Sequence, residues 1–310
     1  MSTNNTDDQG VVFRKSHGQY LVHANGRGIA CALSSRLYKQ ITAPAPDPLA
    51  IGDVVRFSQA GDGPAVITGI LPRRNKFSRQ AVTPGRQVSE QVIVSNVDQV
   101  VPVFAAASPT PKWALLDRYL VSAEAAGLPV LIIITKSDLS RTGDGLAETL
   151  QEYRRVGYPL HCVSAVTGEG LDELARLLLG RTSVLVGKSG VGKTSLLNAL
   201  QPGLGRRVRE VGSGKQGKGR HATTALEMLP LDRGGAVVDT PGIREFGLWD
   251  VDPDDLALYF PEMRALVGSC KFGLDCRHDE EPGCSIRQAV MAGQVSPYRY
   301  RSYLKLRGTS

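Results

Sequence analysis

The chain has 310 residues, of which 42% are hydrophobic, and this composition favours a globular protein of two or three domains with buried cores. The longest apolar run, Leu128 to Ile134, is too short to cross a bilayer, and the polar first nine residues lack the basic and then apolar order of a signal peptide. A membrane-spanning protein is therefore excluded, and a cytoplasmic protein without a membrane partner is expected.

The net charge of +7 is concentrated near the N-terminus. Residues 10–80 hold ten Lys and Arg residues against three Asp and Glu residues, which accounts for the whole excess. A polyanion such as RNA is the natural partner for a basic surface of this kind. The alternative is a solvated basic face that binds nothing.

Residues 1–9 are expected to be a disordered tail, and residues 10–80 a small β domain. Five β-rich runs separated by glycine turns occur in this domain: Val11–Phe13, Tyr20–Val22, Ala30–Leu33, Val54–Phe57 and Ala65–Leu71. This spacing predicts a five-stranded OB-like barrel. Its basic residues are predicted to bind RNA, with one group on a barrel face and one at the exit: Arg27, Arg36, Lys39 and Arg56, then Arg73, Arg74, Lys76 and Arg79. The alternative is a barrel that only packs on its neighbour.

Strands and helices alternate between residues 90 and 247, which predicts a mostly parallel α/β sheet covered on both faces. Strands are expected at Val97–Ala105, Pro129–Ile134, Leu160–Val163, Ser183–Val186 and Ala236–Val238. Helices are expected around Leu116–Ala123, at Leu146–Val156, around Leu171–Leu177, and from Leu196 to Leu200.

A phosphate-binding loop joins the strand Ser183–Val186 to the following helix. Its residues are Gly187, Lys188, Ser189, Gly190, Val191, Gly192, Lys193 and Thr194, and Ser195 follows them. The glycines let consecutive backbone N–H groups form a nest for phosphate oxygens at the N-terminus of a helix. Lys193 is predicted to reach the β- and γ-phosphates, and the hydroxyl of Thr194 to ligate Mg²⁺.

Two short motifs end the strands that precede this loop. Thr135-Lys136-Ser137-Asp138 is similar to the guanine-specificity motif of Ras-like GTPases, which usually begins with Asn, and Ser164-Ala165 resembles the base-binding motif that follows it. The resemblance implies that Asp138 accepts hydrogen bonds from guanine N1–H and the 2-amino group, and that a backbone N–H at Ser164-Ala165 meets guanine O6. A threonine hydroxyl is shorter than the family amide and has fewer donors, so reduced nucleotide affinity is expected.

Two further motifs follow the phosphate loop. The Gly- and Arg-rich loop Arg206–Thr224 ends in Gly219–Thr224, in the place of switch I, and Asp239-Thr240-Pro241-Gly242 is the D-x-x-G of switch II. Asp239 is predicted to hold Mg²⁺ through water, Gly242 N–H to meet the γ-phosphate, and either Thr223 or Thr224 to complete the metal shell.

The predicted catalytic residues are His221, Lys193 and Thr224. Ile243 occupies the position where Ras-like GTPases carry the glutamine that orients water, and an aliphatic side chain cannot do this. His221 in the switch I segment is the candidate replacement. The alternative is that His221 is a solvated loop residue.

The order of the motifs indicates a circular permutation, because the base motifs precede the phosphate loop. With a leading barrel and a trailing Cys/His cluster, the chain resembles the ribosome small-subunit-dependent GTPases of the RsgA or YjeQ family. The resemblance implies an RNA-bound GTPase that acts late in maturation of the small ribosomal subunit, with rRNA and ribosomal proteins as partners. A monomer is expected. The alternatives are an RNA-binding assembly module that is barely catalytic, and an ATPase.

Residues 248–310 are predicted to form a mostly helical zinc-binding domain. Cys270, Cys276, His278 and Cys284 provide the three thiolates and one imidazole of a closed, structural Zn²⁺ site. The alternative is a set of reduced, buried cysteines without metal. The segment Tyr298–Arg307 interleaves tyrosines with bases, which fits either RNA contact or a helix that packs its tyrosines on the metal module. Cys31 and Cys162 are expected to be small apolar residues on strands.

Overall fold

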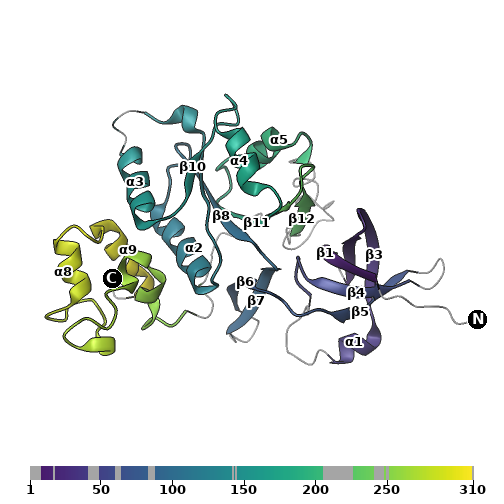
Figure 1. Cartoon of the computed structure of the whole chain (residues 1–310), viewed down its shortest axis with the longest axis horizontal. Coiled ribbons are helices and arrows are strands. Elements are labelled where there is room, and N and C mark those ends of the chain that lie inside the picture. The colour runs from purple at the N-terminus through teal and green to yellow at the C-terminus, as the bar shows by residue number, and fades with distance from the viewer. Residues whose placement is uncertain are drawn as a thin grey trace, which may run out of the picture.

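The computed structural model describes residues 8–16, 18–40, 49–59, 64–82, 88–141, 143, 145–204, 226–240, 248 and 251–308. An N-terminal barrel and a C-terminal helical domain lie on opposite sides of a central α/β domain (Figure 1). None of the helices in the described part of the chain has the length and apolar character that a bilayer crossing needs.

The predicted five-stranded barrel is confirmed. It consists of β1 (Asp8–Ser16), β2 (Gln19–Ala24), β3 (Arg27–Leu33), β4 (Val54–Ser58) and β5 (Ala65–Ile70), with the short helix α1 (Ser35–Gln40) between β3 and β4. The strands follow the order β1-β2-β3-β5-β4, and pairing of β4 with β1 closes the barrel. Alternate residues point inward because the side-chain period of a strand is two; among them, Val12, Val22 and Val55 are fully buried.

A two-stranded ribbon, which the sequence did not indicate, follows the barrel. It pairs β6 (Lys76–Val82) with β7 (Val88–Ser95) in antiparallel register. The four bases predicted as a basic exit are engaged by side chains of the chain itself: Arg73 by Asp53, Arg74 by Asp98, Lys76 by Glu90 and Arg79 by Gln91. This stretch therefore offers less free positive charge than its sequence implies.

The central domain confirms the predicted α/β architecture. Its strands are β8 (Gln99–Ala105), β9 (Ile132–Thr135), β10 (Leu160–Cys162), β11 (Thr182–Val186), β12 (Glu227–Pro230) and β13 (Ala236–Asp239), in the order β10-β9-β8-β11-β13-β12. All neighbours are parallel except β12 and β13. Its helices are α2 (Trp113–Ala125), η1 (Ser137–Leu139), α3 (Leu146–Val156), α4 (Leu171–Leu178) and α5 (Lys193–Leu200).

Alternation along β8 divides these helices between the two faces of the sheet. Val100 and Phe104 belong to the same apolar cluster as the buried residues of α2 and α3. Val101 and Val103 belong to a second cluster with the buried residues of α4 and α5. Since both faces of β8 are covered, all of its residues are buried, as in a central parallel strand.

The C-terminal domain is mostly helical, as predicted. It contains η2 (Leu256–Tyr259), α7 (Pro261–Arg264), η3 (Gly273–Asp275), α8 (Ser285–Met291) and α9 (Pro297–Arg307). On α9, the Tyr300 hydroxyl donates to His278 O at 2.6 Å and the Tyr303 hydroxyl to Arg277 O at 2.9 Å. These two tyrosines therefore pack on the Cys/His module, which is the second of the two alternatives for this segment.

Candidate nucleotide and metal sites

The phosphate loop lies between β11 and α5, at the carboxyl ends of the parallel strands. A Cβ atom at Gly187 would lie 2.4 Å from Val103 O on β8, so only glycine allows this close approach. Gly190 and Gly192 have φ angles of 84° and 95°, in the left-handed region that favours glycine. The motif thus has both the strand-to-helix context and the backbone conformation that a phosphate nest requires.

Lys193 of this loop and Asp239 at the end of β13 are both buried, and their charges interact. The Lys193 Nζ donates to Gly187 O at 2.5 Å and to Lys188 O at 3.2 Å. Burial lowers the pKa of Lys193 and raises the pKa of Asp239, and each charge offsets part of the shift of the other. Burial disfavours the charged form of each residue. A bound phosphate group would stabilise the charge of Lys193, and a bound cation would stabilise the charge of Asp239, so the pair fits a site for a charged ligand.

The carboxylate of Asp239 is suited to binding Mg²⁺. Its Oδ1 atom is buried and has no hydrogen-bond partner within the described residues. Hard Mg²⁺ prefers such oxygen ligands, and the half-buried Thr194, at the start of α5, supplies a second oxygen. Asp239 and Thr194 are therefore suitable Mg²⁺ ligands, either directly or through water.

The base motif braces the phosphate loop. The Thr135 hydroxyl, at the end of β9, donates to Val191 O. Lys136, which has a φ of 56°, donates from Nζ to Gly190 O at 2.9 Å and also to Ser108 O. The short threonine hydroxyl therefore contacts the phosphate loop, because it reaches a backbone carbonyl there.

Asp138 and Ser164 come together from the ends of neighbouring strands. The Ser164 hydroxyl donates to Asp138 Oδ1 at 2.5 Å and accepts from the backbone N–H groups of Val166 and Thr167 at 3.2 Å each. This chain of hydrogen bonds orients an exposed carboxylate at the end of the base motif. Ala165 follows directly and is half-buried.

Other predicted residues lie away from this centre or outside the described residues. The Ser137 hydroxyl donates to Glu169 at 3.3 Å, so it is turned toward a carboxylate of the chain. Ser195 is exposed on α5. The switch I residues His221, Thr223 and Thr224 and the switch II residue Gly242 all lie outside the described residues, so their predicted roles stay predictions.

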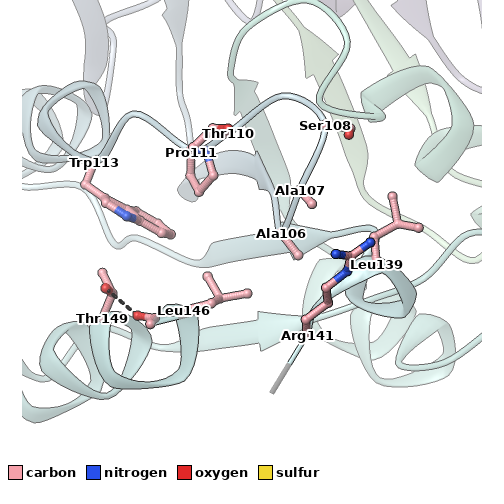
Figure 2. Close-up of a pocket in the computed structure, with 11 residues that line it drawn as sticks. Ala106, Ala107, Ser108, Thr110, Pro111, Trp113, Leu139, Arg141, Leu146 and Thr149 are labelled. Atoms are coloured by element: carbon pink, nitrogen blue, oxygen red, sulfur yellow. Dashed lines mark hydrogen bonds between the residues drawn. The ribbon is translucent and has the colours of Figure 1, made fainter. Parts of the chain in front are cut away.

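An open pocket of about 500 Å³ lies beside the base motif, and no motif in the sequence indicates it (Figure 2). Ser108 of the loop after β8 and Trp113 at the start of α2 line the pocket, together with Leu139 and Arg141. None of the lining residues belongs to the phosphate loop or is Asp138 or Ser164. The pocket is therefore a neighbour of the candidate nucleotide site and not a part of it.

The Cys/His cluster has the geometry of a tetrahedral metal shell. The ligand atoms of the four buried residues, Cys270, Cys276, His278 and Cys284, lie within 4.8 Å of one another. His278 Nδ1 lies 3.5 Å from the sulfurs of Cys270 and Cys284, which are 3.9 Å apart. In a tetrahedral site with Zn–S bonds of about 2.3 Å and a Zn–N bond of about 2.0 Å, the nitrogen lies roughly 3.5 Å from each sulfur, and two sulfurs lie roughly 3.8 Å apart. The donor set and its spacing therefore fit Zn²⁺, with Nδ1 as the histidine ligand.

Comparison with known proteins agrees with this arrangement. The family model described as RsgA GTPase matches residues 70–249. The small ribosomal subunit biogenesis GTPase RsgA of Gemmatimonas aurantiaca is 44% identical over 306 residues, which cover 97% of each chain. The protein of the same name from Moorella thermoacetica is 41% identical over 297 residues, which cover 96% of this chain and 95% of the relative. The chain belongs to the RsgA GTPase family.

Two solved structures share the fold of this chain over nearly its whole length. YjeQ from Thermotoga maritima has a TM-score of 0.77 and 32% identity, with 97% of each chain covered. YloQ, a circularly permuted GTPase, has a TM-score of 0.70 and 27% identity, with 99% of this chain and 96% of that chain covered. Membership of the RsgA GTPase family confirms the predicted GTPase activity and the permuted order of the motifs.

Proposed function

We propose that this GTPase is a late maturation factor of the small ribosomal subunit, that its barrel binds ribosomal RNA, and that the subunit stimulates GTP hydrolysis. The observation that carries the proposal is the braced site: Thr135 and Lys136 of the base motif hold the phosphate loop at Val191 and Gly190. The names of the RsgA relatives supply the small ribosomal subunit as the partner. We also propose that the protein is a cytoplasmic monomer and that it contacts ribosomal proteins as well as rRNA.

The barrel supports the RNA-binding part of this proposal through its surface charge. Arg27, Arg36, Lys39 and Arg56 are all exposed, so their charges face solvent. The carboxylate of Asp53 is instead buried and bound by Arg73, so it does not offset the exposed bases. A surface with excess positive charge attracts the phosphate backbone of RNA and releases its counterions.

The nucleotide site supports GTP hydrolysis by positioning and by charge. Lys193, which now donates to loop carbonyls, would donate to β- and γ-phosphate oxygens, while Asp138 selects guanine through its N1–H and 2-amino donors. Mg²⁺ held by Thr194 and Asp239, with Thr223 or Thr224, would neutralise charge on these phosphates. Gly242 N–H would meet the γ-phosphate, and His221 would orient or deprotonate the attacking water in place of the glutamine that Ile243 replaces.

The proposal is tested by GTP turnover measured with and without purified small ribosomal subunits. We expect subunits to raise the rate by about 10-fold or more, because an ordered switch segment completes the catalytic set. A rate that stays flat on adding subunits would favour the alternative of a barely catalytic RNA-binding module. Displacement of bound GDP by excess ATP or GTP is the control for base specificity, and equal displacement would contradict the role of Asp138.

A further inference from the structure

The barrel and the central domain share one continuous sheet. Strand β1 of the barrel pairs with β12 of the central domain, so the described strands β10 to β4 form a single eleven-stranded sheet. The β1–β12 junction is narrow, with one antiparallel residue pair, Arg14 opposite Glu227. Figure 1 shows β1 in purple beside β12 in green at this junction.

The junction leads directly to the candidate magnesium ligand. Glu227 lies opposite Arg14 on one side and opposite Asp239 of β13 on the other, and Asp239 lies beside Leu185 of β11. Neighbouring strands are about 4.8 Å apart, so Arg14 of the barrel lies only ~10 Å across the sheet from Asp239. One row of cross-strand partners therefore connects the barrel to the metal site.

The side chains of this junction add an ion pair to the backbone pairing. Arg14 and Glu227 approach to 3.9 Å, with side-chain exposures of 47% and 15%. A bulge in β1 between Val12 and Arg14 shifts the register against β2 where β12 joins. Bulges re-aim side chains, and here the bulge accompanies the turn of Arg14 toward the central domain.

A second junction holds the barrel to the end of β7, just before the central domain begins. The buried carboxylate of Asp53 accepts hydrogen bonds from Ser95 at 2.6 Å and from Arg73 at 2.7 Å. Asn96 donates to Gly52 O at 2.8 Å, and a Cβ at Gly52 would lie 2.1 Å from Ser95 O. The barrel is thus anchored just before β8, so a shift of β12 against β8 cannot occur without straining the barrel or the Arg14–Glu227 junction.

We propose that Arg14 and Glu227 are positioning residues that couple the barrel to Asp239, so that the affinity of the barrel for RNA depends on the nucleotide at the phosphate loop. This inference rests on the proposed function, since it takes the barrel to bind ribosomal RNA and Asp239 to hold Mg²⁺. Strand β12 follows the predicted switch I segment in the sequence and β13 ends at Asp239, so each strand that carries the row is next in sequence to a predicted nucleotide contact. The coupling is reciprocal, and RNA on the barrel changes the affinity for the GTP form by the same factor.

The test uses the full-length protein in four forms: unmodified, Arg14→Glu, Glu227→Arg, and the double reversal. The affinity for purified small ribosomal subunits is measured with a non-hydrolysable GTP analogue and with GDP, and the ratio of the two is the readout. We expect each single reversal to reduce this ratio by about two- to fivefold, the range that an exposed ion pair supports, and the double reversal to restore it. A purely structural defect would lower both affinities together and leave the ratio unchanged.

The matched control is the exposed pair Glu173 and Arg176 on α4, whose side chains approach to 2.6 Å. The single charge reversals Glu173→Arg and Arg176→Glu should leave the ratio as it is in the unmodified protein. Single reversals of Arg14 and Glu227 that leave the ratio unchanged, or a double reversal that fails to restore it, would overturn the coupling alone. Absence of subunit binding in the unmodified protein would instead overturn the proposed function, and the coupling with it.

Discussion

At the scale of single residues, Thr135 contacts the phosphate loop although its side chain is shorter than the usual asparagine. Its one hydroxyl proton is directed to backbone carbonyls, since Oγ1 lies within hydrogen-bond distance of Val191 O and, at 3.2 Å, of Phe104 O. Thr135 therefore braces the phosphate loop. No hydroxyl donor is left for a base, so the proposed recognition of guanine rests on Asp138, which Ser164 orients.

The residue-scale prediction concerns the water-activating group. His221→Ala is expected to leave the affinity for GTP nearly unchanged and to lower the subunit-stimulated rate by about 10²-fold or more, because a general base or water-orienting group is lost. Fluorescent-nucleotide titration and turnover at saturating small subunits measure the two quantities. Lys193→Ala is the comparison, since loss of a phosphate-binding cation should weaken nucleotide binding itself. Hydrolysis by His221→Ala as fast as by the unmodified protein would exclude this role for His221.

At the scale of elements, the C-terminal domain depends on its Cys/His cluster because its helices are short. The helix α7 spans Pro261–Arg264 and α8 spans Ser285–Met291, and such helices are marginal without tertiary support. The Cys284 sulfur accepts from Arg287 N at the start of α8, and Tyr300 of α9 donates to His278 O. The cluster therefore organises both helices that follow it.

Zinc is expected to be part of this fold. Elemental analysis of purified protein should find about one zinc per chain, and Cys276→Ser should lose most of it and lower the unfolding temperature of this domain. The reason is that the free energy of zinc binding, about 10–16 kcal/mol in zinc-finger peptides, becomes folding free energy. Cys162→Ser is the control, because Cys162 is a half-buried residue of β10 outside the cluster and its change should leave the zinc content intact. Much less than one zinc in folded, unmodified protein would contradict the assignment.

At the scale of the whole molecule, the C-terminal domain is attached to the central domain by buried charge. Arg299 of α9 is 1% exposed and donates to Asp117 of α2 and, at 2.7 Å, to Glu262 of α7. Its guanidinium also lies 4.6 Å from the ring centre of Phe260 and 5.6 Å from that of Tyr153 on α3. One cation thus joins elements from both domains.

Removal of this cation is expected to destabilise the protein strongly. Arg299→Ala leaves Asp117 and Glu262 buried without their partner, at a cost of about 3–5 kcal/mol. Calorimetric unfolding measures the effect, and easier proteolysis of the C-terminal domain would accompany it. Arg301→Ala is the matched control, because Arg301 is exposed on the same helix and should change stability by less than about 0.5 kcal/mol. An equally small effect of Arg299→Ala would show that the domains are held together by other contacts.

Local patterns in the sequence determined most of the elements and the identity of the binding groups. The predicted strand Ser183–Val186 and helix Leu146–Val156 correspond to β11 and α3, because apolar periodicity and glycine turns act over a few residues. The phosphate loop, the base motifs and the four candidate zinc ligands were readable for the same reason. Each is a short segment whose chemistry depends on residue type and spacing.

The tertiary structure alone decided how distant segments meet. The ribbon of β6 and β7 has no local signal, because the partners of the bases in and just before β6 lie far along the chain: Glu90 is 14 residues from Lys76, and Asp98 is 24 residues from Arg74. The sequence alone is compatible with RNA contact by Tyr300 and Tyr303 of α9, and only the tertiary structure shows that they pack on the Cys/His module. The pairing of Arg14 with Glu227 and of Arg299 with Asp117 left no local signal, because contacts across 182 residues or more depend on the folded arrangement of domains and not on sequence spacing.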